Sequence, residues 1–337
     1  MTNLRTLKYL LNYNDLTDDW NLSYGITKNR SDALLTSPKH SFFNPLSETA
    51  LTLFLLGNID GWKQIGTLNI FPRDKDSKWN KTFFDNIRSS INIFNNIPSR
   101  DNLWLYNREF KEKIFGSDEI DIHRSILLFE FEMMNSAFHP VQRKAFKDLS
   151  FVAIRNMRKW SKFDAVLIVP NEKLFIFFES KLTSDISQNT KKYPYINQIM
   201  RNLESAFLLT NHRNSLYKDW KFRYVFICPR KIDQYRLTRY SWVLNSIEKS
   251  ISIFREIINN EYESSINKEC YSEFELFARQ IPSCIIKVYW DDIGNILESK
   301  DRKFFNNYLD RLEGAGLEEE KIENIKERFR KVGMNVS

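Results

Sequence analysis

The sequence is poor in the residues and runs on which several protein classes depend. Its three cysteines, Cys228, Cys270 and Cys284, are odd in number and far apart, which favours buried thiols over a disulfide framework or a zinc site. No apolar run approaches the roughly 20 residues that a membrane-spanning helix needs. The start, MTNLRTLKYLLNYNDL, lacks the apolar core and cleavage site of a signal peptide. We therefore expect a soluble, cytoplasmic protein with no membrane partner.

Several catalytic motifs are also missing. The chain has no G-x-S-x-G, no H-E-x-x-H, no G-x-x-x-x-G-K-[ST] and no G-x-G-x-x-G. These absences argue against a serine hydrolase, a zinc protease, a P-loop ATPase and a Rossmann enzyme. We find no internal repeat and no low-complexity tract either.

What the chain does have is a composition typical of folded proteins. Of its 337 residues, 42% are apolar and 28% are charged, and 27 phenylalanines help to raise the aromatic share to 15%. The formal net charge is +7, and its basic residues are clustered, so we expect some of them to contact phosphates. The expected contacts are Arg143, Lys144, Lys147, Arg155, Arg158, Lys159, Lys191, Lys192 and Arg201. A second basic stretch runs from Lys221 to Tyr240.

Apolar patterning predicts an α/β protein with a mixed central sheet flanked by helices. The predicted helices cover Glu119 to Phe138, Pro194 to Thr210 and Trp242 to Asn259, with two more between Asp301 and Lys331. The predicted strands cover Phe151 to Met157, Asp164 to Val169, Leu174 to Lys181, Phe222 to Cys228 and Cys284 to Trp290. We divide the chain into an N-terminal recognition or regulatory region at 1–115, a core at 116–300 and a C-terminal helical tail at 301–337.

The stretch FDAVLIVPNEKLFIFFESK, from Phe163 to Lys181, contains the most informative charges. Its two apolar runs are joined by the four residues Pro170 to Lys173, which predicts an antiparallel hairpin. If Val169 pairs with Leu174, then Asp164 is opposite Glu179, with Cβ atoms roughly 4.5 to 5.5 Å apart. Lys181 shares the face of Glu179, because side chains alternate along a strand. Pairing across the turn therefore gathers two acids and a lysine.

Two neighbouring carboxylates need a shared proton or a cation. Ligation by carboxylate oxygens, completed by water and phosphate, suits Mg²⁺ or Mn²⁺. A lysine beside such a centre can hold an attacking water and offset charge on a phosphoryl oxygen. The arrangement is therefore suited to phosphodiester hydrolysis, with Asp164 and Glu179 as metal ligands and Lys181 as the catalytic lysine.

At these residues the chain resembles the PD-(D/E)xK nuclease superfamily, which has the restriction-endonuclease-like fold. Asp164 matches the motif aspartate, and Glu179-Ser180-Lys181 matches the E-x-K at the end of the following strand. The resemblance covers roughly residues 118 to 290 and implies an αβββαβ core. In the RecB-like branch a glutamine on the next helix contributes to the active site, and Gln198 is the candidate.

The resemblance also implies a glutamate on the helix before the sheet. On the helix predicted for Glu119 to Phe138, Glu130 falls within the apolar arc at 100° per residue, whereas Glu132 falls on the other side. We therefore expect Glu130 to be an auxiliary acid and metal ligand and take Glu132 as its control. A buried carboxylate is costly unless it has a partner, and the metal would provide one.

The E-x-K pattern alone is weak, since it recurs at Glu109 to Lys111, Glu298 to Lys300 and Glu319 to Lys321. The first and last of these lie on segments without a strand pattern, and only Ile296 and Leu297 precede the second. We therefore assign the motif to Glu179 to Lys181.

The expected function is that of an Mg²⁺-dependent endonuclease acting on DNA, and the resemblance favours a role in prokaryotic restriction or anti-phage defence. Two alternatives stay open: a non-catalytic nucleic-acid-binding or assembly subunit of the same fold, and an RNase. A homodimer or a partner protein subunit is compatible with each of them.

Overall fold

A computed structural model describes the central part of the chain. Its described residues are 52, 56, 62–65, 104–122, 125–134, 160–181, 186, 197–211, 217–236, 238–261 and 267–297. The strand predicted for Phe151 to Met157 and the helices predicted between Asp301 and Lys331 lie outside them. Among the described helices, none is both long and apolar enough to cross a membrane.

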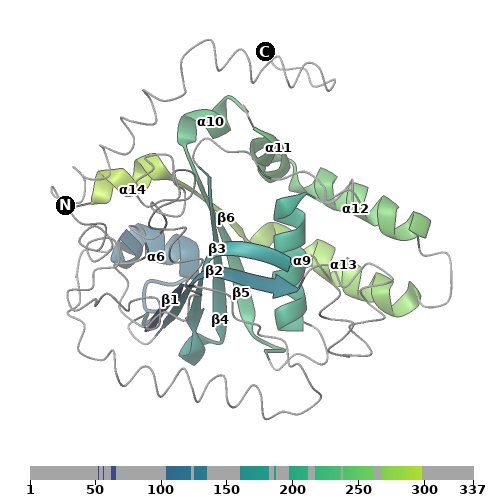
Figure 1. Cartoon of the computed structure of the whole chain (residues 1–337), viewed down its shortest axis with the longest axis horizontal. Helices are drawn as coiled ribbons and strands as arrows, with labels where there is room; N and C mark the ends of the chain where they lie inside the picture. Colours follow the sequence, from purple (N-terminus) through teal and green to yellow (C-terminus); the bar gives the residue numbers. More distant parts are fainter. Residues whose placement is uncertain are drawn as a thin grey trace.

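Six strands form one mixed sheet, which supports the α/β prediction (Figure 1). In spatial order they are β1 (Trp62–Ile65), β2 (Ile126–Met134), β3 (Trp160–Val169), β4 (Leu174–Ser180), β5 (Lys221–Cys228) and β6 (Ile285–Tyr289). Strands β2, β3 and β4 are antiparallel neighbours, whereas β1 is parallel to β2, and β4, β5 and β6 are parallel to one another. The carboxyl ends of β4, β5 and β6 therefore meet at one edge of the sheet.

The β3–β4 hairpin has the predicted register. Val169 pairs with Leu174 and Ala165 with Phe178. The connection is a short 3₁₀ turn, η2 (Pro170–Glu172), followed by Lys173 in the left-handed conformation at φ 49°. The Lys173 N–H donates to the Pro170 carbonyl over 3.1 Å and closes the turn. The four-residue loop therefore fixes which strand residues lie opposite one another.

The helix predicted for Glu119 to Phe138 is wrong, because the structure has strand β2 at Ile126–Met134. The sequence Phe-Glu-Phe-Glu-Met at 129–133 alternates apolar and acidic residues with the period of a strand. The same residues also form an apolar arc on a helical projection, and this arc led to the wrong prediction of a helix. Pairing with both β1 and β3 supplies hydrogen-bond partners that local pattern cannot reveal.

A helix that was not predicted precedes β2 and ends at Gly116. Helix α6 (Arg108–Phe115) begins at Asn107, whose side chain accepts from the N–H groups of Glu109 and Phe110. It ends at Gly116, whose φ of 82° is a left-handed cap conformation that glycine adopts without strain. Helix α6 is preceded by a 3₁₀ turn, η1 (Trp104–Tyr106).

The remaining described helices follow the β3–β4 hairpin in the chain. They are α9 (Gln198–Asn211), α10 (Arg230–Gln234), α11 (Arg239–Asn245), α12 (Ile247–Glu261), α13 (Asn267–Cys284) and α14 (Trp290–Ile296). The helix predicted from Pro194 appears as α9, and the one predicted from Trp242 is divided into α11 and α12 at Ser246. Helix α13 was not predicted. Arg255 and Glu275 join α12 to α13 by two hydrogen bonds of 3.0 and 3.1 Å.

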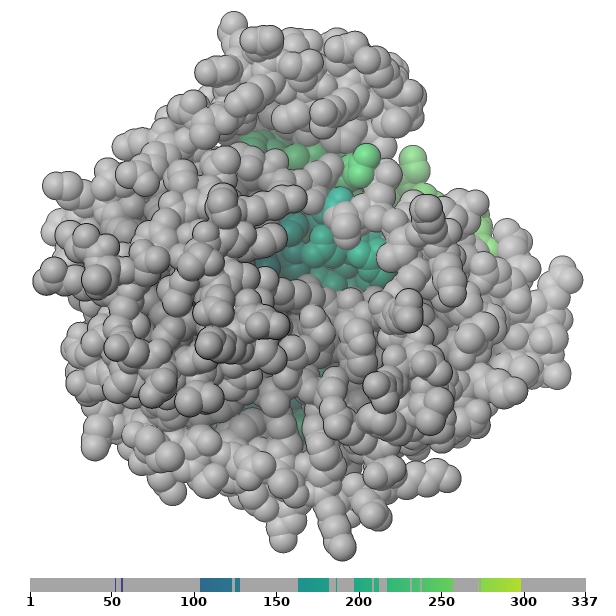
Figure 2. Space-filling view, in the orientation of Figure 1, coloured from purple at the N-terminus to yellow at the C-terminus, as the bar shows by residue number. Residues whose placement is uncertain are grey.

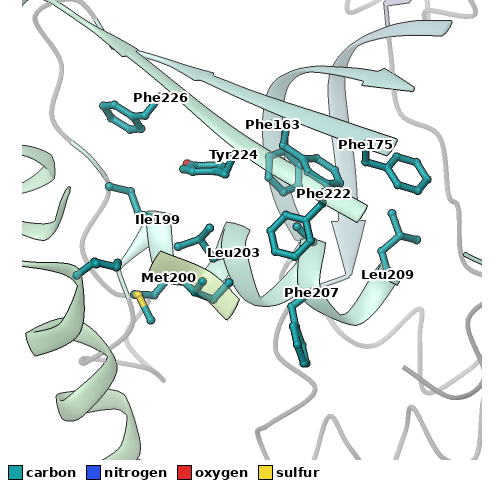
Figure 3. Close-up of a cluster of buried hydrophobic side chains, with 14 of the residues drawn as sticks. Phe163, Phe175, Ile199, Met200, Leu203, Phe207, Leu209, Phe222, Tyr224 and Phe226 are labelled. Carbon is teal, nitrogen blue, oxygen red and sulfur yellow. The ribbon is translucent and has the colours of Figure 1, made fainter. Parts of the chain in front are cut away.

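Helices α9, α12 and α13 lie on one side of the sheet, and α6 and α14 lie on the other (Figure 1). The core on the α9 side is rich in aromatic rings, and Figure 3 shows Leu203 of α9 near Tyr224 and Phe222 of the sheet. Phe163 and Phe177, from β3 and β4, have ring centroids 4.5 Å apart. This packing holds α9 against the hairpin.

Residues from the expected N-terminal region contribute to the same sheet as the core. Strand β1 pairs with β2 from Trp62 to Ile65. The buried Thr52 hydroxyl donates to the Ser180 hydroxyl over 2.9 Å. Ser180 is the residue that follows Glu179 in the chain. The N-terminal region therefore contacts the hairpin that bears the motif.

Candidate active site

Asp164 lies on β3 beside the carboxyl end of β4. The paired ladder extends as far as Ala165 and Phe178, which brings Asp164 and Glu179 to adjacent positions on the two strands. Asp164 Oδ2 accepts a 2.6 Å hydrogen bond from the backbone N–H of Ser180. The Asp164 side chain is partly exposed. Asp164 therefore holds the end of β4 through this bond while part of the residue stays exposed.

The Glu179 carboxylate is buried, with 1% of the residue exposed, and side chains from two elements hold it. Its Oε1 accepts from Gln198 Nε2 over 2.7 Å and lies 2.7 Å from Lys181 Nζ. Its Oε2 accepts from Asn202 Nδ2 over 3.1 Å. A buried carboxylate is costly unless its oxygens have such partners. The contacts of Glu179 therefore provide partners for both of its carboxylate oxygens.

Lys181 follows the last residue of β4, and neighbouring elements hold its backbone. Its N–H donates to the Ile227 carbonyl of β5 over 2.8 Å. Its carbonyl accepts from the indole Nε1 of Trp290 in α14 over 2.9 Å. The Lys181 side chain is only 8% exposed and forms an ion pair with Glu179. The two charged ends of the E-x-K motif therefore lie together, as the sequence predicted.

The first turn of α9 supplies the predicted glutamine and a further residue that the sequence did not single out. Gln198 and Asn202 are four residues apart, so both side chains fall on one helical face, and both donate to Glu179. The available signal was this spacing after the E-x-K motif. Asn202 also lies 3.5 Å from the Tyr224 hydroxyl of β5.

Burial and the nearby carboxylates shape the electrostatics of the site. Burial raises the pKa of Tyr224 well above its usual value, and the charges of Glu179 and Asp164 raise that pKa further. Tyr224 is therefore a neutral hydroxyl at physiological pH. Burial lowers the pKa of Arg201, whereas Glu179 and Glu204 act in the opposite direction. Arg201 thus places a second basic side chain in the field of Glu179.

Glu130 lies on strand β2, and its expected position on a helical face is a wrong prediction. Its neighbours Phe129 and Phe131 pair with Ala165 and Phe163 of β3. The register therefore puts position 130 across from position 164. Glu132 is two residues further along the same strand and pairs with Lys162. Glu130 and Glu132 are therefore not separated onto two faces of a helix. The sheet instead brings position 130 next to the strand that bears Asp164.

Of the basic residues expected to contact phosphates, only Arg201 belongs to the part of the chain that the structure describes, on α9. The others lie outside the described residues: Arg143, Lys144, Lys147, Arg155, Arg158, Lys159, Lys191 and Lys192. In Figure 2, residues from the middle of the chain, coloured teal and green, are visible at the surface.

The one competing E-x-K occurrence that the structure describes lies on a helix. Glu109 and Lys111 lie on helix α6, so they lack the strand that the motif requires. Those at 298–300 and 319–321 lie outside the described residues.

A second polar cluster lies two strands from Glu179 on the same side of the sheet. Glu179 pairs with Phe226 of β5, and Phe226 pairs with Lys287 of β6. Lys287 Nζ lies 2.7 Å from the buried carboxylate of Asp233, which also accepts from the Tyr289 hydroxyl over 2.8 Å. These contacts link α10 to β6, so we assign the cluster a structural role.

Part of the second basic stretch is likewise committed to the fold. Arg230 forms an ion pair with Asp292, and its guanidinium lies 4.3 Å from the Tyr289 ring centroid. Arg223 Nη1 donates to the Ser283 carbonyl over 2.8 Å.

The expectation of buried thiols is confirmed for Cys228, whereas Cys284 is only partly buried and the side chain of Cys270 lies outside those that the structure describes. Cys228 is buried, and neither Cys228 nor Cys284 is in a disulfide. Burial raises the pKa of both thiols, which disfavours the thiolate. They are therefore poor candidates for nucleophiles.

The donor chemistry at the sheet edge fits a hard divalent cation. Asp164 and Glu179 contribute carboxylate oxygens, the ligand type that Mg²⁺ and Mn²⁺ prefer. Within the described ranges, no group of three or more histidine, cysteine, aspartate or glutamate side chains is gathered to hold a metal. A cation at this edge would thus rely on the two carboxylates together with water or substrate oxygens.

Comparison with family models, curated proteins and solved structures finds no match for this chain.

Proposed function

We propose that the protein is a divalent-metal-dependent nuclease that hydrolyses phosphodiester bonds, with DNA as its substrate. The observation that carries the proposal is the buried contact between Glu179 and Lys181, 2.7 Å apart, beside Asp164 at the end of the β3–β4 hairpin. An acid, a lysine and a second acid at one sheet edge are the groups that this chemistry requires.

The element order supports the proposal independently of the side chains. Among the described elements, helix α6, strands β2, β3 and β4, helix α9 and strand β5 come in the order α-β-β-β-α-β. This is the order of a restriction-endonuclease-like core, with α6 and β2 in the places that the sequence had given to other segments. The antiparallel β2–β3–β4 unit and the parallel β4–β5 pair fit the same core.

In this mechanism Asp164 and Glu179 would hold Mg²⁺ or Mn²⁺, which would supply Lewis-acid stabilisation of a phosphoryl oxygen. Lys181 Nζ donates hydrogen bonds to a water or to a phosphate oxygen and offsets negative charge there. Glu179 orients that ammonium through their ion pair. Gln198 keeps Glu179 Oε1 in place. Arg201, which interacts electrostatically with Glu179, would add positive charge to the site.

The proposal is tested by cleavage assays with Mg²⁺ or EDTA on supercoiled plasmid, linear duplex DNA, single-stranded DNA and RNA. Wild-type protein should cut DNA only with the metal, and Glu179→Gln and Lys181→Met should lower the rate by at least about a hundredfold. Arg108→Ala, on the exposed face of α6, is the matched control and should cut normally.

Cleavage that survives both substitutions would contradict the proposal. Cleavage confined to RNA would assign the same site to an RNase. If wild-type protein binds nucleic acid and cuts none of the four substrates, a non-catalytic binding subunit is the better assignment.

A further inference from the structure

We infer that Asn202 is a positioning residue that fixes the Glu179 carboxylate for cation binding, an inference that rests on the proposed function. Asn202 is 1% exposed, and its Nδ2 donates to Glu179 Oε2 over 3.1 Å. Gln198 and Lys181 contact the other oxygen, Oε1. The two carboxylate oxygens are therefore held from different residues.

Holding both oxygens restricts rotation of the carboxylate about its last torsion. A terminal carboxylate torsion is broad and has little intrinsic preference. With only Oε1 held, Glu179 could turn about that contact and move Oε2. The Asn202 contact removes this freedom, so that the carboxylate edge is already oriented before a cation arrives.

The neutrality of the amide matters as much as its position. An amide N–H₂ donates hydrogen bonds without adding positive charge. A second basic side chain there, in addition to Lys181, would compensate the carboxylate further and weaken its attraction for a cation. The adjacent Arg201 is basic, and the turn of α9 directs the neutral residue to Glu179 Oε2.

Asn202 has a second partner through the same amide nitrogen that contacts Glu179. Its Nδ2 lies 3.5 Å from the hydroxyl of Tyr224, which is completely buried on β5. Leu203 and Ile199 of α9 are buried in the core next to the sheet (Figure 3). The orienting donor is thus part of a rigid helix–sheet contact. Partners that orient a metal ligand in this way typically change metal affinity about 10- to 100-fold when removed.

The test measures Mn²⁺ binding by isothermal titration calorimetry of the full chain, without substrate. Asn202→Leu removes the donor at similar volume and should weaken Mn²⁺ binding at least about tenfold. Asn211→Leu is the matched control, because Asn211 lies on the same helix and bonds to the Phe207 carbonyl instead. It should bind Mn²⁺ like wild type. Unchanged affinity in folded Asn202→Leu would reduce Asn202 to a structural role and overturn the inference.

Glu179→Gln separates the inference from the proposed function. If Glu179→Gln abolishes Mn²⁺ binding and Asn202→Leu leaves it unchanged, the inference alone fails. If Glu179→Gln binds Mn²⁺ like wild type, both fail. Should Asn202→Leu not fold, the side-chain amide signals of Asn202 in ¹⁵N-labelled wild type replace it. Those signals should shift when Mg²⁺ is added, and signals that stay in place would overturn the inference.

Discussion

The ammonium of Lys181 lies 2.7 Å from Glu179 Oε1, and both side chains are buried at the carboxyl end of β4. An ion pair removed from water contributes net stability only when its geometry is good and its other oxygens have partners. Gln198 and Asn202 supply those partners. The ion pair therefore affects both the stability of the fold and the chemistry of the site, and the two effects can be measured separately.

Removing Lys181 should destabilise the fold because it leaves the buried Glu179 charge without its cation. We expect Lys181→Met to lower the free energy of unfolding by about 3 kcal/mol. The double variant Glu179→Gln/Lys181→Met should be less destabilised than Lys181→Met alone, since no buried charge remains. Urea unfolding of the two single variants and the double variant measures this coupling. Strictly additive effects would contradict it.

Two substitutions at Asp164 should distinguish the role of its hydrogen bond from the role of its charge. Asp164→Asn keeps an oxygen for the Ser180 N–H and loses the charge, whereas Asp164→Ala loses both. We expect Asp164→Ala to cost about 1 to 3 kcal/mol of unfolding free energy and Asp164→Asn less than about 1 kcal/mol. Both should abolish Mg²⁺-dependent cleavage. An active Asp164→Asn protein would argue against metal ligation by this residue.

The second polar cluster should affect stability without affecting the site. Lys287 is the ion-pair partner of Asp233, which is 3% exposed. Lys287→Met should lower the free energy of unfolding by about 2 to 3 kcal/mol, somewhat less than for a fully buried pair, because part of Lys287 reaches solvent. Mn²⁺ affinity should stay at the wild-type value. The exposed pair of Arg108 with Glu112 gives the comparison, and Arg108→Ala should cost less than about 1 kcal/mol.

High pH should destabilise the protein through its buried tyrosines. Burial raises the pKa of Tyr217 above the ordinary value of about 10 that the unfolded chain keeps. Above pH 10 the unfolded state releases this proton while the folded state retains it, so the stability contributed by Tyr217 is full below pH 10 and is lost as the pH rises. The expected slope is about 1.4 kcal/mol per pH unit. Chemical unfolding between pH 9.5 and 11.5 should show a smaller slope for Tyr217→Phe than for wild type, and equal slopes would contradict the assignment.

The sequence predicted the hairpin and its charges because their arrangement is local. A four-residue connection sets the register, and the alternation of strand side chains then determines which residues share a face. Asp164, Glu179 and Lys181 could therefore be brought to one edge without knowledge of the rest of the fold. Strand β5, helix α9 and strand β6 were recognised as well, since their apolar patterns matched their environments.

Strand β2 shows where local pattern stops being sufficient. Ile126 to Met134 fits both a helical arc and a strand alternation. Only pairing with β1 and β3, which are distant in the chain, decides between the two. The position of Glu130 relative to Asp164 depends on that pairing and could not follow from a helical projection.

By itself, the sequence determined which residues could form a carboxylate–lysine site and which turn would assemble them. Only the tertiary structure decided how Glu179 is held, because Gln198 and Asn202 reach it from a helix 19 and 23 residues further along the chain. The aromatic core between α9 and the hairpin sets the distance between this helix and Glu179. Such contacts depend on how two elements pack against each other, and no short-range pattern in the chain encodes that packing.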